Sequence, residues 1–129
     1  MPQDYAQAVV WYRKAAEQGD PDAQTIVALM YVNGHGVSHD YAQALIWYRK
    51  AADQGNGSAQ LGLGLMYANG HGVPQDYVRA RMWFDIAAAA ASDVSVRTAV
   101  KWRDLVATRM TPAQVAEAQR LAREWTPTK

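Results

Sequence analysis

The amino-acid sequence predicts an all-α protein, a solenoid of three stacked helix pairs followed by a C-terminal capping helix. Three observations lead to this expectation. A segment of 36 residues recurs along the chain, its apolar residues follow helical spacing, and a complete helix-start signal lies near the end. Because 50% of the 129 residues are hydrophobic, the chain can bury a core, and we expect one domain over residues 1–129.

The repeat begins at an Asp-Tyr pair. The segment Asp-Tyr-Ala-Gln-Ala at 4–8 returns at 40–44 and, in diverged form, at 76–80. Residues 4–39 and 40–75 are identical at 23 of 36 positions. A fixed period of this length is typical of stacked repeats. It predicts units at approximately 4–39, 40–75 and 76–110.

Each unit contains the pattern of two helices. In the first helix, Asp4 is the expected N-cap and Gly19 the expected left-handed residue after the C-terminus. The second helix covers 23–32 and ends at the Asn-Gly-His-Gly turn of 33–36, where glycines permit a sharp change of direction. The apolar face of the first helix consists of Tyr5, Ala8, Tyr12, Ala15 and Ala16.

Two glycines interrupt the second helix of the middle unit. Gly62 and Gly64 each cost about 1 kcal/mol relative to alanine inside a helix. We expect this cost to be offset by the close approach of a neighbouring helix backbone.

The end of the chain predicts a capping helix at 111–126. Thr111 is an N-cap residue, Pro112 occupies the first helical position, and Gln114 completes a capping box. The preceding segment, 94–108, shares almost nothing with the earlier second helices, as is common in terminal repeats. The apolar stripe that should cover the open end of the stack consists of Val115, Ala118, Leu121, Ala122 and Trp125.

The units resemble Sel1-like repeats of the bacterial type, relatives of tetratricopeptide repeats. The resemblance is carried by Trp-Tyr-Arg-Lys-Ala-Ala-Asp-Gln-Gly at 47–55, by Ala59 and Gln60, and by Leu-Gly-Leu-Met-Tyr-Ala-Asn-Gly-His-Gly-Val at 63–73. It covers roughly residues 2–93, and 110–125 is similar to the end of bacterial members. It implies a right-handed superhelix whose concave surface holds proteins or peptides, and therefore an adaptor role.

The first helix of each unit leaves a second stripe opposite its core face, at positions 7, 10, 14 and 17 and their equivalents. In a stack of helix pairs this stripe should face outward and line the inner curve. A tryptophan flanks each stripe, and Trp is favoured at binding hot spots, although packing at the seam between helices is an alternative. The candidate partner-binding residues are Gln7, Val10, Trp11, Lys14, Gln43, Ile46, Trp47, Lys50, Arg79, Met82, Trp83 and Ile86.

The sequence lacks the residues that several kinds of catalytic and metal-binding sites require. The chain has no cysteine, and its serines stand in no nucleophile motif, so we expect no catalytic residue and no enzyme activity. His35 and His71 occupy equivalent loop positions, but spacing suggests no third zinc ligand, so we expect no metal and no cofactor. Some cysteine-rich relatives are linked to penicillin binding or β-lactamase activity, which leaves an envelope-associated glycan-binding or β-lactam-hydrolase-like module as an alternative function.

Charge and hydropathy restrict the expected binding partners to proteins or peptides. A formal net charge of +1 argues against nucleic acid, and no run approaches the roughly 18 apolar residues that cross a membrane. The first residues carry no signal-peptide pattern, and both cytoplasm and periplasm are compatible with the sequence. The basic segment 95–129 could meet an acidic partner or simply be a solvated helix.

The front of the repeat array predicts an uncovered helix. Residues 1–4 align with 73–76, so the first helix has no second helix before it. Repeat arrays need covered ends for solubility. Self-association through this edge, or a purely structural and oligomerising role, is therefore a further alternative.

Overall fold

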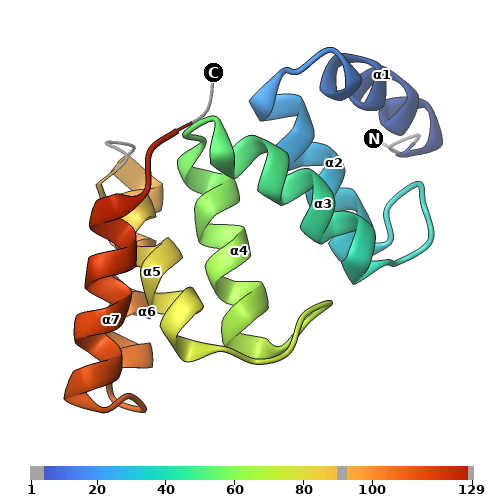
Figure 1. The fold of residues 1–129 in the computed structure, drawn as a ribbon. Coiled ribbons are helices and arrows are strands. Elements are labelled where there is room, and N and C mark those ends of the chain that lie inside the picture. The colour runs from blue at the N-terminus through green and yellow to red at the C-terminus, as the bar shows by residue number, and fades with distance from the viewer. Residues whose placement is uncertain (1–4, 90–92, 128–129) are drawn as a thin grey trace.

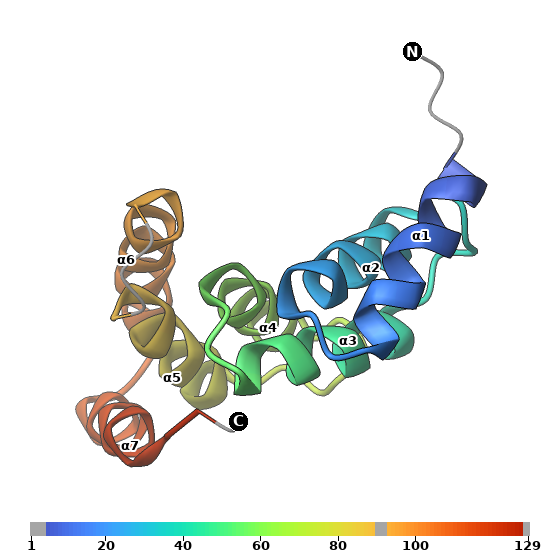
Figure 2. The ribbon, with the colours of Figure 1, turned by 90° about the horizontal axis from the view of Figure 1, so that it is seen from above.

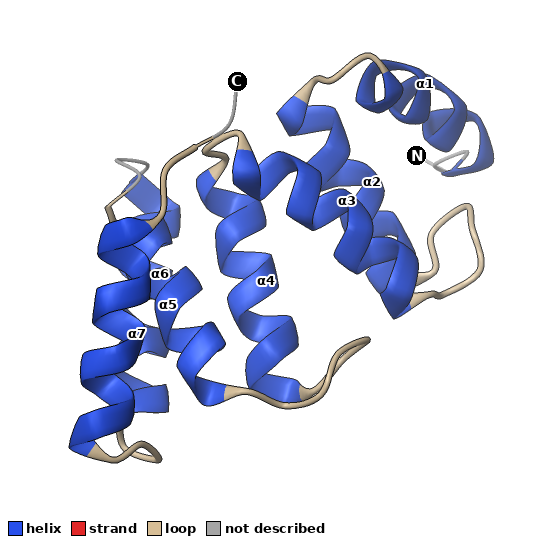
Figure 3. Cartoon of the chain, viewed as in Figure 1, coloured by secondary structure: helices blue, strands red, loops and turns tan. Residues whose placement is uncertain are grey.

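A computed structural model describes residues 5–89 and 93–127, and these ranges contain seven helices and no strand (Figure 3). The all-α fold predicted from the repeat is confirmed. The helices are α1 (Tyr5–Glu17), α2 (Pro21–Asn33), α3 (Tyr41–Asp53), α4 (Gly57–Asn69), α5 (Tyr77–Ala88), α6 (Asp93–Ala107) and α7 (Pro112–Glu124).

The helices follow one another along a curved row. Each helix from α1 to α5 packs against the next one, α4 also touches α6, and α7 returns to pack against α5 (Figure 1). Seen from above, α1 lies at one end of the row and α6 and α7 lie at the other (Figure 2). The position of α7 beside α5 differs from that of a repeat helix, since α3 and α5 pack mainly on the second helix of the preceding unit. None of the helices in the described ranges is long and apolar enough to cross a membrane.

Side-chain caps fix where the helices begin. The Asp40 carboxylate accepts a hydrogen bond from the Gln43 amide (3.1 Å), and Asp76 accepts one from the Arg79 amide (3.0 Å). These caps satisfy backbone donors that the first turn of a helix leaves unpaired. Asp4, the predicted N-cap of the first unit, lies outside the described residues.

The Asn-Gly-His-Gly turns have the same geometry in both units. Gly34 and Gly70 follow α2 and α4 with φ angles of 72° and 70°, in the left-handed region that favours glycine. Gly19, after α1, also has a positive φ, as the sequence predicted. The chain therefore turns in the same way after α2 and α4.

The predicted core face of the first helices is buried only where helices pack on both sides. Tyr48 on α3 and Phe84 on α5 are 6% and 0% exposed, but the equivalent Tyr12 on α1 is 39% exposed. The expectation that Tyr12 is a core residue is therefore wrong. The reason is that, among the described helices, α1 packs mainly against α2, whereas α3 lies between α2 and α4.

The two glycines of α4 accommodate aromatic rings, and the predicted approach of a helix backbone is wrong. A Cβ atom on Gly62 would lie 2.7 Å from Cζ of Tyr48, and one on Gly64 would lie 2.6 Å from Cδ1 of Phe84. Real Cβ atoms do not approach other carbons so closely. The glycines therefore make room for rings of α3 and α5, which explains their presence inside a helix.

The capping helix has the predicted start. The Thr111 hydroxyl accepts a hydrogen bond from the Gln114 amide (3.1 Å), and the Gln114 side chain accepts one from the Thr111 amide (2.9 Å). Ala118 is fully buried, and the Trp125 ring packs edge-on against Trp83 with 5.9 Å between ring centroids. The apolar stripe of α7 thus covers α5.

The buried Tyr48 phenol predicts a loss of stability at alkaline pH. Burial raises the pKa of Tyr48 to about 12, so the folded state keeps a proton that the unfolded chain releases near pH 10. The free energy of unfolding should therefore fall as the pH rises from 10 to 12, by about 2 kcal/mol from this group. Urea unfolding of Tyr48→Phe should lack this part of the decline. Phenylalanine is native at the equivalent position 84, and an unchanged pH profile would contradict the assignment.

Candidate partner-binding groove

Three surface hollows recur at the same repeat positions along the first helices. The first hollow, about 290 Å³, is lined by Val10, Arg13, Lys14 and Glu17 of α1. The second, about 340 Å³, has the equivalent four residues of α3, together with Leu45 and two side chains of α4. The third, about 720 Å³, lies on the equivalent face of α5. We call this row the groove.

The second hollow combines exposed apolar surface with cations. Ile46 is 47% exposed beside Lys50, whose ammonium lies 4.8 Å from the centroid of the Trp47 ring. Arg49 pairs with Asp53 (3.2 Å), and its guanidinium carbon lies 5.5 Å from the Trp83 ring. Cation–π contacts of this kind hold the charged heads at fixed places on the surface. The hollow therefore offers an apolar patch bordered by positive charge.

Four of the candidate residues are buried, and the expectation that two of them, Met82 and Ile86, face outward is wrong. Trp47 and Trp83 are 6% and 1% exposed, and Met82 and Ile86 are 8% and 6% exposed. The two tryptophans belong to the core, as the alternative of seam packing predicted. Met82 and Ile86 also pack into this core, which includes Leu121, Ala122 and Trp125 of α7. The equivalent positions on α1 and α3 have no such helix beside them.

The remaining candidates divide into two groups. Val10 and Lys14 line the first hollow, and Ile46 and Lys50 line the second. Of the four buried candidates, Ile86 borders the third hollow. The others lie outside these hollows. Trp11 is 65% exposed, Gln7 is exposed, Gln43 is half-buried, and Arg79 forms an ion pair with the N-cap Asp76 (3.4 Å).

The third hollow, which we call the cleft, contains residues that the sequence prediction missed. It lies between α5 and α7, with contributions from α4 and α6, and its polar lining differs from that of the other hollows. The missed residues that matter below are Gln60, Arg81, Asp85, Arg103 and Arg123. A comparison of aligned units would have shown that Arg81 replaces the apolar Val9 and Leu45.

An ion pair forms the wall of the cleft on α5. Nε of Arg81 donates to both carboxylate oxygens of Asp85 at 3.1 Å, and the two side chains are 10% and 16% exposed. Burial raises the pKa of the Asp85 carboxyl above its ordinary value, although the charges of Arg81 and Arg103 act in the opposite direction. The loss of water around the carboxylate thus outweighs the attraction of its neighbours.

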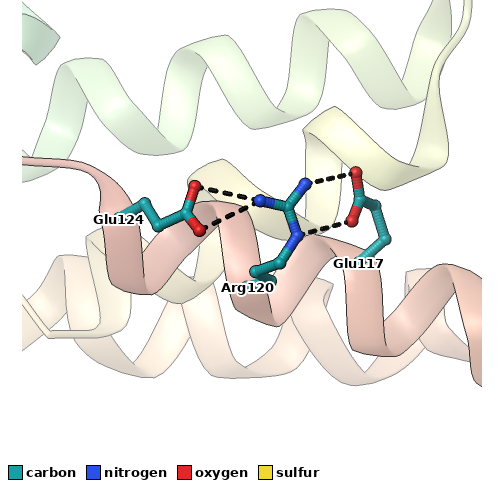
Figure 4. Close-up of polar contacts among 3 residues, drawn as sticks. All are labelled: Glu117, Arg120 and Glu124. Atoms are coloured by element: carbon teal, nitrogen blue, oxygen red, sulfur yellow. Dashed lines mark hydrogen bonds and ion pairs between the residues drawn. The ribbon is translucent and has the colours of Figure 1, made fainter.

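The arginine at the centre of α7 is neutralised. Figure 4 shows the Arg120 guanidinium between two carboxylates, donating to Glu117 at 2.8 and 2.9 Å and to Glu124 at 3.0 Å. These hydrogen bonds raise the pKa of Arg120 and lower that of Glu117. Arg120 therefore adds little to the basic character predicted for 95–129, to which Arg123 contributes without an ion-pair partner among the described residues.

The loop histidines pack against a tyrosine. The His71 ring stacks on Tyr41 at 4.3 Å between centroids, and the His39 ring meets the same tyrosine edge-on at 4.3 Å. Across the part of the chain that the structure describes, no three His, Asp or Glu side chains are grouped to hold a metal ion.

Stacked helix pairs with a row of surface hollows define a helical-repeat scaffold. Three Sel1 repeats match the sequence, over residues 1–20, 21–56 and 57–92, and the chain belongs to the Sel1 repeat family. Sel1 repeats typically bind proteins, and the family is generally a non-catalytic scaffold. No curated protein matches the sequence.

Two solved structures share the fold. One is c5321, described as a protective antigen present in uropathogenic Escherichia coli strains and displaying an SLR fold, with 36% identity and a TM-score of 0.89. The other is a Sel1 repeat protein from Oxalobacter formigenes, with 32% identity and a TM-score of 0.71. The matches cover 95% and 94% of this chain but only 26% and 39% of those proteins. The chain thus spans a minor part of each relative's length.

Proposed function

We propose that the chain is a non-catalytic scaffold that holds a protein or peptide partner along the groove. One observation carries this proposal: equivalent positions of α1 and α3 place an exposed aliphatic side chain beside a lysine in a hollow. Val10 is 65% exposed and lies with Lys14 in the first hollow, and Ile46 lies with Lys50 in the second. A partner with a matching period would contact both hollows at once.

The exposed aliphatic side chains supply the affinity in this proposal. Burying apolar surface contributes about 25 cal/mol per Å², so two aliphatic side chains and their surroundings are worth a few kcal/mol. The neighbouring lysines add selectivity, because a partner without negative charge or acceptors would have to desolvate them. Affinity and selectivity therefore come from the same two hollows.

A triple substitution tests the groove. Lys14→Gln, Ile46→Ala and Lys50→Gln together should abolish the capture of peptides selected from a random display library against the wild-type chain. The melting temperature should change little, because all three side chains are exposed. Leu29→Ala is the matched control, since Leu29 on α2 is 48% exposed and lies outside the three hollows. Undiminished peptide capture by the triple variant, or loss of capture in the Leu29→Ala control, would contradict the proposal that the partner binds in the groove.

Self-association is a second candidate, favoured by the exposed aromatic side chains of α1. Trp11 and Tyr12 are 65% and 39% exposed, whereas Trp47 and Tyr48 at equivalent positions are buried. A second copy packed on α1 would cover them. Light scattering of the purified chain should then show a mass that rises with concentration and falls in Trp11→Ser. A monodisperse monomer at high concentration would argue against this role.

A further inference from the structure

The cleft is more than twice as large as either of the other hollows, and its charge differs from theirs. Arg103 on α6 stands where the earlier units have Tyr31 and Tyr67. Ala89 stands where they have the acidic Glu17 and Asp53. In the opposite direction, Asp85 stands where they have arginine and Ile86 where they have lysine, so the third unit rearranges charge along the cavity without changing its sum. The additional positive charge of the cleft comes from Arg123 on α7.

Three arginines border the cleft against one carboxylate. Arg81 is paired with Asp85, and Arg103 is paired with Asp104 at 3.1 Å, although Asp104 does not line the cleft. Among the described residues, Arg123 has no ion-pair partner. An acidic ligand in the cleft would meet one guanidinium from α6 and one from α7. The formal charge of the lining side chains favours an acidic ligand.

Among the described residues, one buried acceptor of the cleft lining has no hydrogen-bond partner. Gln60 is 1% exposed, its Nε2 donates to the Ala52 carbonyl (3.1 Å), and its Oε1 has no partner among the described residues. The equivalent Gln24 makes the same bond to Ala16 (3.1 Å), but its Oε1 accepts from Gln54 Nε2 at 2.9 Å.

The sequence explains why Gln60 lacks the side-chain donor that Gln54 provides to Gln24. The residue 36 positions after Gln54 is Ala90, and alanine has no side-chain donor. An unpaired buried acceptor is unfavourable and attracts an N–H or O–H group. Trp47 Nε1 is also buried without a partner, but Trp47 does not line the cleft. Of these two described residues, Gln60 is the one that lines the cleft.

We infer that the cleft anchors an acidic peptide segment that also carries apolar side chains. Its carboxylates pair with Arg103 and Arg123, one of its amide N–H groups donates to Gln60, and an apolar side chain packs on Trp125 and Ile86. Peptides provide these three groups within a few residues. The inference rests on the proposed function and deepens it by naming the partner's chemistry and the place where it is held.

The test uses fluorescent peptides of defined composition. A twelve-residue peptide of alternating Glu and Leu should bind the full chain, and the same peptide with Gln in place of Glu should bind about tenfold more weakly or worse. Arg103→Gln with Arg123→Gln should weaken binding of the acidic peptide by a similar factor. The matched control is Arg97→Gln with Arg109→Gln, which removes the same charge from exposed sites outside the cleft and should leave affinity within about twofold.

The outcomes separate the cleft from the first two hollows of the groove. If Arg103→Gln with Arg123→Gln binds as wild type while the groove triple variant does not, the cleft inference fails and the proposed function stands. If selected library peptides do not respond to the groove variant, the proposed function fails. Equal weakening by the Arg97 and Arg109 control, or equal affinity for a single-stranded DNA 12-mer, would overturn the assignment of an acidic peptide to the cleft.

Discussion

Replacing Gly64 with alanine is expected to destabilise the fold by about 2–3 kcal/mol, against the usual preference for alanine in helices. The new methyl group would overlap the ring of Phe84, lying 2.6 Å from Cδ1 and closer still to Cε1. Because Phe84 is fully buried, its ring has no free space into which to retreat. Urea unfolding followed by circular dichroism would measure the loss.

The same substitution should change sign when the ring is absent. Phe84→Ala alone costs about 3–5 kcal/mol, but in that background Gly64→Ala should stabilise the helix by about 1 kcal/mol. Ala28 at the equivalent position of α2 is fully buried, so this helix position accepts a methyl group where no ring lies against it. An equal cost of Gly64→Ala in both backgrounds would show that the ring contact is not the reason for the glycine.

The features that depend on local sequence were predicted correctly. The caps at Asp40 and Asp76, the glycine turns after α2 and α4, and the capping box at Thr111 each require a few residues close together in the chain. Their geometry is decided by backbone hydrogen bonds and permitted φ angles. Such features do not change with the position of a unit in the stack.

The burial of repeated positions could not be predicted in the same way. Tyr12, Tyr48 and Phe84 are equivalent in sequence, but their exposure depends on how many helices pack around each one. The same holds for Met82 and Ile86, which join a core that includes side chains of α7. A periodic pattern describes one unit and its average neighbour, so errors concentrate in the first and last units.

The cleft was missed because the third unit departs from the pattern at the positions that form it. Arg81 follows Val9 and Leu45, where the other two units have apolar side chains. Asp85 follows Arg13 and Arg49, so the charge at that position is reversed. These departures are visible in the sequence once the units are aligned, but only the structure shows that Arg103 and Arg123 reach the same cavity.

Asp85→Ala is expected to cost about 3 kcal/mol, because it leaves the largely buried Arg81 without its counter-charge. This cost comes from the burial of the unpaired Arg81 charge and not from the strength of the ion pair. Burial raises the pKa of Asp85 even though Arg81 contacts it. The attraction between the two charges therefore does not compensate for the hydration that they lose on burial. Removing both charges should therefore cost much less than removing one.

The double variant Arg81→Leu with Asp85→Ala should unfold within about 1 kcal/mol of wild type, since Leu45 shows that this repeat position accepts leucine. Thermal and urea unfolding of the two single variants and the double variant would complete the cycle. Additive losses in the double variant would mean that the ion pair itself stabilises the fold. A near-neutral double variant would instead leave ligand binding in the cleft as the reason for an arginine where the other units have Val9 and Leu45.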